Sequence, residues 1–313
     1  MSPPEGPTPP PRWRRVLRGS WLLVVAGGIA YALVDRSDEI GPRLAQVEPW
    51  PLTLSAALGV VGVGLSLGIW RALLAGLGHQ LDARAAAQVF FVGQLGKYLP
   101  GSVWPVVAQA ELGRDHGVPP RASFAAVTLF LWVHLVTGGI VAAVTLATAG
   151  VVPWPVSLLA LPGLALLAPT PLAWLLGRGA RIVRRRPFER LPDTATMRRA
   201  AGWAAAMWIA YAAHLAAALT AFEAGAPLAL AAGAFAAAWC AGFLFLIAPA
   251  GAGARDVAMI ALLSIGVAAA PAIAAVLASR LLLTLADVGW GLAGLVAGRR
   301  RVASAVARSD RRR

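Results

Sequence analysis

Residues 91–110 read FVGQLGKYLPGSVWPVVAQA and bring a charge and a helix break together inside an apolar run. Lys97 is the only lysine among 313 residues, and it shortly precedes the Pro-Gly pair Pro100 and Gly101. A helix that stops inside a bilayer leaves backbone polar groups unpaired, which is tolerated only beside protein or a water-filled cavity. Charge beside a broken helix is typical of binding sites in membrane carriers. The alternative is a short interfacial helix whose Lys97 reaches the lipid headgroups.

The composition is that of an integral membrane protein. Hydrophobic residues make up 58% of the chain and charged residues 13%, with a mean hydropathy of +0.69. The formal net charge of +14 arises mainly from arginine clusters at residues 12–18, 178–199 and 299–313. Basic clusters beside spans set orientation and attract anionic lipid. We therefore expect membrane lipids as partners and no nucleic acid.

The sequence contains no recognisable catalytic or metal-binding motif. The single cysteine, Cys240, excludes an internal disulfide, and the four histidines do not fall at metal-ligand spacing. The side chains of His134, His214, Asp256 and Asp287 could exchange protons, but no two of them have a spacing that indicates catalysis. We predict no catalytic residue, no metal and no cofactor, and a transporter rather than an enzyme.

Six apolar stretches are interpreted as full spans. The first could instead be a cleaved signal peptide, because residues 30–32 show a small-x-small pattern, but we favour a retained helix. Pro162, Pro169 and Pro171 should kink the fourth stretch. The basic clusters predict a multi-pass protein of the cytoplasmic (inner) membrane with both termini in the cytoplasm. The six stretches are 19–34, 52–70, 122–150, 156–177, 200–222 and 271–298.

Two further segments are predicted to be re-entrant or broken-helix hairpins. Residues 84–113 have apolar arms of about 14 and 10 residues, each too short to span, and should open to the cytoplasm. Residues 226–270 must begin and end outside if the C-terminal tail is cytoplasmic, so they form either a second re-entrant pair or two short helices. Gly93 precedes Pro100 by the same interval as Gly242 precedes Pro249.

These features predict an inverted repeat within a single transmembrane domain over residues 19–298. Its halves are residues 19–150 and 156–298. A disordered basic N-terminus, residues 1–18, precedes the domain, and an arginine-rich cytoplasmic tail, residues 299–313, follows it. The predicted fold class is an all-α polytopic membrane protein with about six full spans and two hairpins.

Both breaks are predicted to contribute to a substrate-binding site. Glycines in the second break let the backbone turn and leave N–H groups open at the positive end of a helix, where Arg255 would favour an anion. The alternative is that Arg255 and Asp256 form an interfacial pair. The first break offers open N–H groups together with Ser102 and Lys97. The candidates from the two breaks are Lys97, Pro100, Gly101, Ser102, Gly251, Gly253, Arg255 and Asp256.

Two charges in the last span complete the candidate set. Arg280 and Asp287 lie roughly 13 and 24 Å into this helix by its rise, where charge is costly, so both should face the protein interior. They share a face but are two turns apart, so each could pair with another helix or take part in transport. For His134 and His214, with Tyr211 one turn before the latter, we predict hydrogen-bonded packing.

At LGKYLPGSVWPV and PAGAGARD the chain resembles the flippase-like family that includes the transmembrane region of lysylphosphatidylglycerol synthase. Pro100 and Gly101 match its first break, and the second break matches its P-x-G-x-G-x-R-E/D pattern, with Asp256 where glutamate is commoner. The resemblance implies two re-entrant elements and movement of lipids between leaflets. Bifunctional members add a soluble aminoacyl-transfer domain. This sequence ends soon after Gly298, so we expect any such transfer to need a separate protein.

The predicted function is a lipid translocase of the cytoplasmic membrane. An anionic or zwitterionic headgroup would be held by Lys97, Arg255 and helix-end N–H groups while the lipid chains stay in the bilayer. The alternative is a membrane-bound transferase, or an accessory subunit of one, that acts on lipid-linked sugars in envelope biosynthesis and depends on Asp256 or Asp287. A third possibility is a scaffold that docks a separate envelope-biosynthesis enzyme. A homo-oligomer is compatible with each of these functions.

Overall fold

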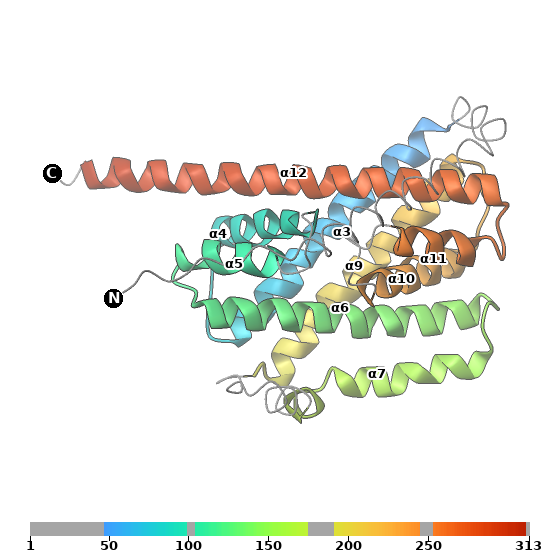
Figure 1. Cartoon of the computed structure of the whole chain (residues 1–313), viewed down its shortest axis with the longest axis horizontal. Coiled ribbons are helices and arrows are strands. Elements are labelled where there is room, and N and C mark those ends of the chain that lie inside the picture. The colour runs from blue at the N-terminus through green and yellow to red at the C-terminus, as the bar shows by residue number, and fades with distance from the viewer. Residues whose placement is uncertain (1–46, 99–103, 175–190, 245–252, 311–313) are drawn as a thin grey trace, which may run out of the picture.

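The computed structural model describes residues 47–98, 104–174, 191–244 and 253–310, with side chains described as far as Gly298. Every named element in these ranges is a helix, and Figure 1 shows them as one bundle along which α12 runs. Four of these helices are long and apolar enough to cross a membrane. The predicted all-α polytopic membrane fold is therefore confirmed. The four are α3 (Pro49–Gly76), α6 (Pro120–Thr148), α9 (Thr194–Ala221) and residues Ala269–Gly298 of α12 (Ala269–Asp310).

The fourth predicted span, 156–177, is an interrupted helix over its described residues. It comprises η3 (Trp154–Leu159), α7 (Ala160–Leu166) and a helical stretch over residues 169–174. The interruption at residues 167–168 directly precedes Pro169, which confirms the predicted kink there. Pro162 lies in the first turn of α7, where proline is tolerated. The first predicted span, 19–34, lies outside the described residues.

The centre of the bundle is the antiparallel packing of α3 on α9. The backbone N–H of Glu48, before α3, donates to the carbonyl of Ala221 at the end of α9. Along the contact, a Cβ atom on Gly62 of α3 would lie 2.6 Å from the Tyr211 ring of α9. Small residues let transmembrane helices approach closely, which is the main source of packing energy between helices in lipid.

The first hairpin follows α3 and consists of two arms in direct contact. Asp82 caps its first helix by accepting hydrogen bonds from the backbone N–H groups of Arg84 and Ala85. A Cβ atom on Gly96 would lie 2.8 Å from the backbone nitrogen of Pro105, so the arms meet through backbone. The elements are α4 (Ala83–Ala87), the π-helix η1 (Gln88–Val92), the 3-10 helix η2 (Leu95–Tyr98) and α5 (Trp104–Arg114).

The second hairpin consists of two short helices that pack on each other. They are α10 (Leu228–Leu244) and α11 (Ala254–Leu263), on either side of residues 245–252, which are not described. α10 has 17 residues and is an apolar helix below the length of the candidate spans. The sequence left open a re-entrant pair or two short helices, and the two helices seen on either side of the break fit both alternatives.

The two hairpins approach the middle of α12 from its opposite ends. For the first hairpin, a Cβ atom on Gly298 would meet the side chain of Gln88, and one on Gly291 would meet Leu95. Gln88, near the base of the hairpin, therefore lies at the end of the span, and Leu95, nearer its tip, lies closer to the centre. The tip of the first hairpin thus points toward the centre of the span. In the second hairpin, Ile260 of α11 packs near the start of α12, against Ala270 and Ile273, so the beginning of α11 also points toward the centre.

The contact of the first hairpin with α12 can be tested with a matched pair of glycines. Gly294→Ala would place a Cβ atom 2.9 Å from the backbone oxygen of Ala87, which cannot move without displacing the hairpin. Overpacking of this kind costs about 1–3 kcal/mol, so we expect a lower melting temperature in detergent. The would-be Cβ of Gly289 has open space, and Gly289→Ala should keep or raise the melting temperature because alanine is the better helix former. Equal changes in the two variants would contradict this packing.

Candidate functional site

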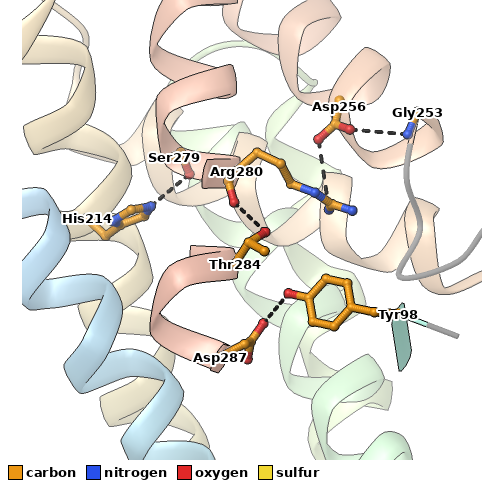
Figure 2. Close-up of polar contacts among 8 residues, drawn as sticks. All are labelled: Tyr98, His214, Gly253, Asp256, Ser279, Arg280, Thr284 and Asp287. Carbon is orange, nitrogen blue, oxygen red and sulfur yellow. Dashed lines mark hydrogen bonds and ion pairs between the residues drawn. The ribbon is translucent and has the colours of Figure 1, made fainter. Parts of the chain in front are cut away.

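Asp287 joins the tip of the first hairpin to α12. Its Oδ2 atom lies 2.7 Å from the Nζ of Lys97 and accepts a hydrogen bond of 2.6 Å from the Tyr98 hydroxyl. Figure 2 shows Tyr98 pointing at this carboxylate. The Asp287 side chain is only 10% exposed, and that of Lys97 is 33% exposed. A carboxylate therefore holds Lys97 inside the protein. An interfacial lysine that reached the lipid headgroups would not make this contact.

Asp256 joins the beginning of α11 to α12. One carboxylate oxygen accepts a hydrogen bond of 3.2 Å from the backbone N–H of Gly253, and the other lies 4.0 Å from the Nη1 of Arg280. Figure 2 shows both contacts. Gly253 has φ +83°, a backbone conformation that glycine adopts without strain, so it can start α11 immediately after the break. Asp256 thus fixes the start of its own helix and pairs with an arginine on another one.

Arg280 and Asp287 provide one partner for each hairpin on a single face of α12. Between them, the hydroxyl of Thr284 donates to the Arg280 carbonyl at 2.8 Å, as Figure 2 shows. The sequence indicated that these two charges share a face and are too far apart to pair with each other. The structure gives each of them a partner on a different hairpin, in agreement with the interpretation that both pair with other helices.

Arg255 lies near these two ion pairs and contacts an aromatic ring. Its guanidinium carbon lies 4.7 Å from the centre of the Phe235 ring of α10, and that ring stacks on Tyr211 of α9. Arg255 interacts electrostatically with Arg280, Asp256 and other charged groups of the cluster. A cation over an aromatic face is attracted by the ring quadrupole, most strongly where water is excluded.

The described site therefore gathers residues from both halves of the chain. Six predicted residues lie at or near the middle of α12, and we call them the central charge cluster: Lys97, Gly253, Arg255, Asp256, Arg280 and Asp287. Four other predicted residues, Pro100, Gly101, Ser102 and Gly251, lie outside the described residues. Within the described ranges, no group of three His, Cys, Asp or Glu side chains could hold a metal ion.

A buried hydrogen-bond network that was missed from the sequence lies beside the cluster. His214 of α9 contacts the Ser55 hydroxyl of α3 through Nδ1 at 2.9 Å and the Ser279 hydroxyl of α12 through Nε2 at 2.7 Å. The predicted hydrogen-bonded role of His214 is confirmed, although its partners are these serines, whereas Tyr211 stacks on Phe235. A single serine in an apolar helix does not change the hydrophobic pattern of the sequence. Only the fold could therefore reveal that Ser55 and Ser279 contact His214.

His134 of α6 lies in an aromatic cluster. Its ring centre is 4.7 Å from those of Phe130 and Trp239 and 5.6 Å from that of Trp208. The Nδ1 atom is buried, and the described residues offer it no hydrogen-bond partner. The predicted packing role of His134 is confirmed, but the predicted hydrogen bonding is wrong at Nδ1.

The described residues include four membrane-capable helices, and two hairpins bring charged side chains to one of them. These features define a polytopic membrane protein with a charged interior. Residues 20–291 match the family described as the lysylphosphatidylglycerol synthase transmembrane region. This range includes most of the 313 residues and both hairpins, so the chain belongs to that family, as its two break motifs indicated. A comparison with curated proteins found no match. The protein is thus a multi-pass membrane protein of a lipid-modifying and flippase-like family.

The pairing of Lys97 with Asp287 can be tested by a double-mutant cycle. Lys97→Met leaves a buried carboxylate without its cation, which costs about 3–5 kcal/mol in buried pairs, so we expect a marked fall in melting temperature in detergent. Replacing both residues by methionine removes the unpaired charge and should restore most of the loss.

The control for this cycle is the pair of Glu111 and Arg114, whose side chains are 64% and 59% exposed. An exposed pair contributes about 0–1 kcal/mol, so its single and double methionine variants should differ little from the unchanged protein. Additive losses at Lys97 and Asp287 would show that the two side chains do not interact.

Proposed function

We propose that the protein is a lipid translocase that moves a phospholipid or lipid-linked headgroup between the leaflets of the membrane. The observation that carries this proposal is the central charge cluster, which is formed where two oppositely directed hairpins meet on one helix. Charges at membrane depth are costly, and those retained there commonly mark a substrate pathway. A buried ion pair is weak evidence for stability, so a role in binding better explains why two such pairs are kept.

The ion pairs of the cluster can be exchanged for contacts with a substrate. A phosphate oxygen that approaches Lys97 competes with Asp287, and one that approaches Arg280 competes with Asp256. Separation of either pair loosens the contact of one hairpin with α12 while the other hairpin stays in place. Because the hairpins approach from opposite ends of α12, this would open the site toward one side of the membrane at a time, as in alternating access.

The surface of α12 suits a substrate with apolar chains. Arg280 and Asp287 face inward, whereas Leu281, Leu285 and Leu292 on the same helix are 57–60% exposed. Exposed leucines on a membrane helix contact lipid tails without cost, since the tails are as apolar as leucine. A headgroup at the cluster and lipid chains against the outer face of α12 would therefore share one helix.

We propose that the arginine-rich end of the bundle lies in the cytoplasm and that the membrane is the cytoplasmic one. Gly76, at the end of α3, faces Thr196 in the first turn of α9, so exposed Arg198 lies at this end. Gly298 of α12 faces Gln88 shortly after the loop that follows α3, which brings the arginines after residue 298 to the same end, as Figure 1 shows. Clusters of arginine beside spans favour the cytoplasmic side.

Translocation is tested in liposomes that contain fluorescent phosphatidylglycerol, with a quencher that reaches only the outer leaflet. Lys97→Met/Asp287→Met, which should remain folded, removes the cation that would bind the headgroup and the carboxylate that the headgroup would displace. We expect lipid movement to slow by at least about tenfold, the loss expected when a charge-assisted hydrogen bond is removed. The matched control, Glu111→Met/Arg114→Met, should keep the rate of the unchanged protein. A folded double variant at Lys97 and Asp287 that moves lipid as fast as the control would refute the assignment of this site.

A further inference from the structure

Arg255 differs from the other cations of the central charge cluster in its counter-charge. Lys97 has Asp287 as its partner, and Arg280 has Asp256. Among the described residues, no carboxylate lies within 4.0 Å of the Arg255 guanidinium. Three cations therefore face two carboxylates, and the excess positive charge is at Arg255, beside the Phe235 ring.

An unpaired guanidinium that is partly buried in a membrane protein requires an explanation. Buried charges are almost always paired with an opposite charge, because removal from water is expensive. The Phe235 ring provides a cation–π contact, which offsets only part of that cost. Because neither nearby carboxylate pairs with Arg255, the remaining stabilisation must come from a group outside the described residues, and a bound anion is such a group.

His134 provides a second, independent observation near Arg255. The side chain is 4% exposed, and its Nδ1 atom has no hydrogen-bond partner among the described residues. Its ring packs on Trp239 of α10 at 4.7 Å, one turn along that helix from the Phe235 ring that Arg255 contacts. Buried polar atoms are normally hydrogen-bonded, so an orphaned one indicates a missing water, ion or ligand. An oxygen of an anion bound to Arg255 would accept a hydrogen bond from this imidazole.

We infer that Arg255 and His134 bind the phosphate of a lipid headgroup whose net charge is negative. The inference deepens the proposed function by naming its substrate class, and it rests on that function only for the ligand being a lipid. A phosphodiester that carries no amine neutralises the excess charge at Arg255. A zwitterionic headgroup carries its own ammonium, so its binding leaves the net positive charge of the cluster unchanged. The site therefore selects anionic over zwitterionic lipid.

The test measures the melting temperature of the purified full chain in detergent as lipid is added. Phosphatidylglycerol should raise the melting temperature, because a ligand that binds only the folded state stabilises it, and phosphatidylcholine should not. Arg255→Gln should abolish the shift, and His134→Phe, which keeps the aromatic ring, should weaken the apparent affinity for phosphatidylglycerol by about tenfold. Arg198→Gln, at an exposed arginine, is the matched control and should bind like the unchanged protein.

Melting temperatures measured without lipid show whether a substitution has damaged the fold of the protein. Because Arg255→Gln removes an uncompensated charge, its melting temperature without lipid should equal or exceed that of the unchanged protein. A large fall would show that Arg255 has a partner within the protein and would overturn the inference. So would equal stabilisation by the two lipids, or an unchanged phosphatidylglycerol shift in Arg255→Gln.

Inorganic phosphate distinguishes a lipid headgroup from a free anion. It should compete with phosphatidylglycerol only at much higher concentration. If inorganic phosphate alone gives the full stabilisation at equal concentration, the ligand is a free anion, and the assignment to lipid is overturned.

The same variants separate this inference from the proposed function. Binding of phosphatidylglycerol that depends on Arg255, in a protein that moves no lipid, would refute translocation and support the anion site. Movement of lipid at equal rates for phosphatidylglycerol and phosphatidylcholine would support translocation and refute the selectivity inferred here.

Discussion

The carboxylate of Asp287, two turns from Arg280 on α12, is the contact on which the arrangement of the interior depends. It holds the lysine and the tyrosine at the tip of the first hairpin, while Arg280 pairs with the beginning of α11 in the second. The two turns between these side chains correspond to about 10 Å along the helix axis. One helix thus sets the separation of two segments that are distant in sequence and brings the charges that they carry to neighbouring turns of its span.

This arrangement explains why charge is retained in so apolar a chain. Elsewhere the bundle is held by close packing of small residues against large ones, as where Gly68 of α3 contacts Trp203 of α9, and by the hydrogen bonds of His214. Such contacts are sufficient to hold helices together in lipid. In the proposed function, ion pairs at the hairpin tips add contacts that a charged substrate would replace, which apolar packing cannot offer. In the proposed function, the packing of α3 and α9 would form the fixed frame, and the hairpin tips would be the parts that move.

The sequence predicted much of this structure because its strongest signals are local. Long apolar runs gave four membrane-capable helices, and Pro169 gave the interruption after α7. Isolated charges in apolar runs gave Lys97, Arg255, Arg280 and Asp287, since each is conspicuous in such a context. Pairing depends on contacts between distant segments, so the sequence could not show that Lys97 pairs with Asp287 while Arg255 has no carboxylate partner among the described residues. Ser55 and Ser279 escaped notice because a serine in an apolar helix is unremarkable until a histidine lies beside it.

We expect the two hairpins to enter the bundle from opposite faces of the membrane and to meet on α12. In a Cys240→Ala background, Gln80→Cys places a single exposed thiol at the base of the first hairpin, and Ser264→Cys places one at the base of the second. A thiol reagent that cannot cross membranes should label residue 264 in intact spheroplasts and residue 80 only in inverted vesicles. Labelling of both residues from the same face would contradict the account.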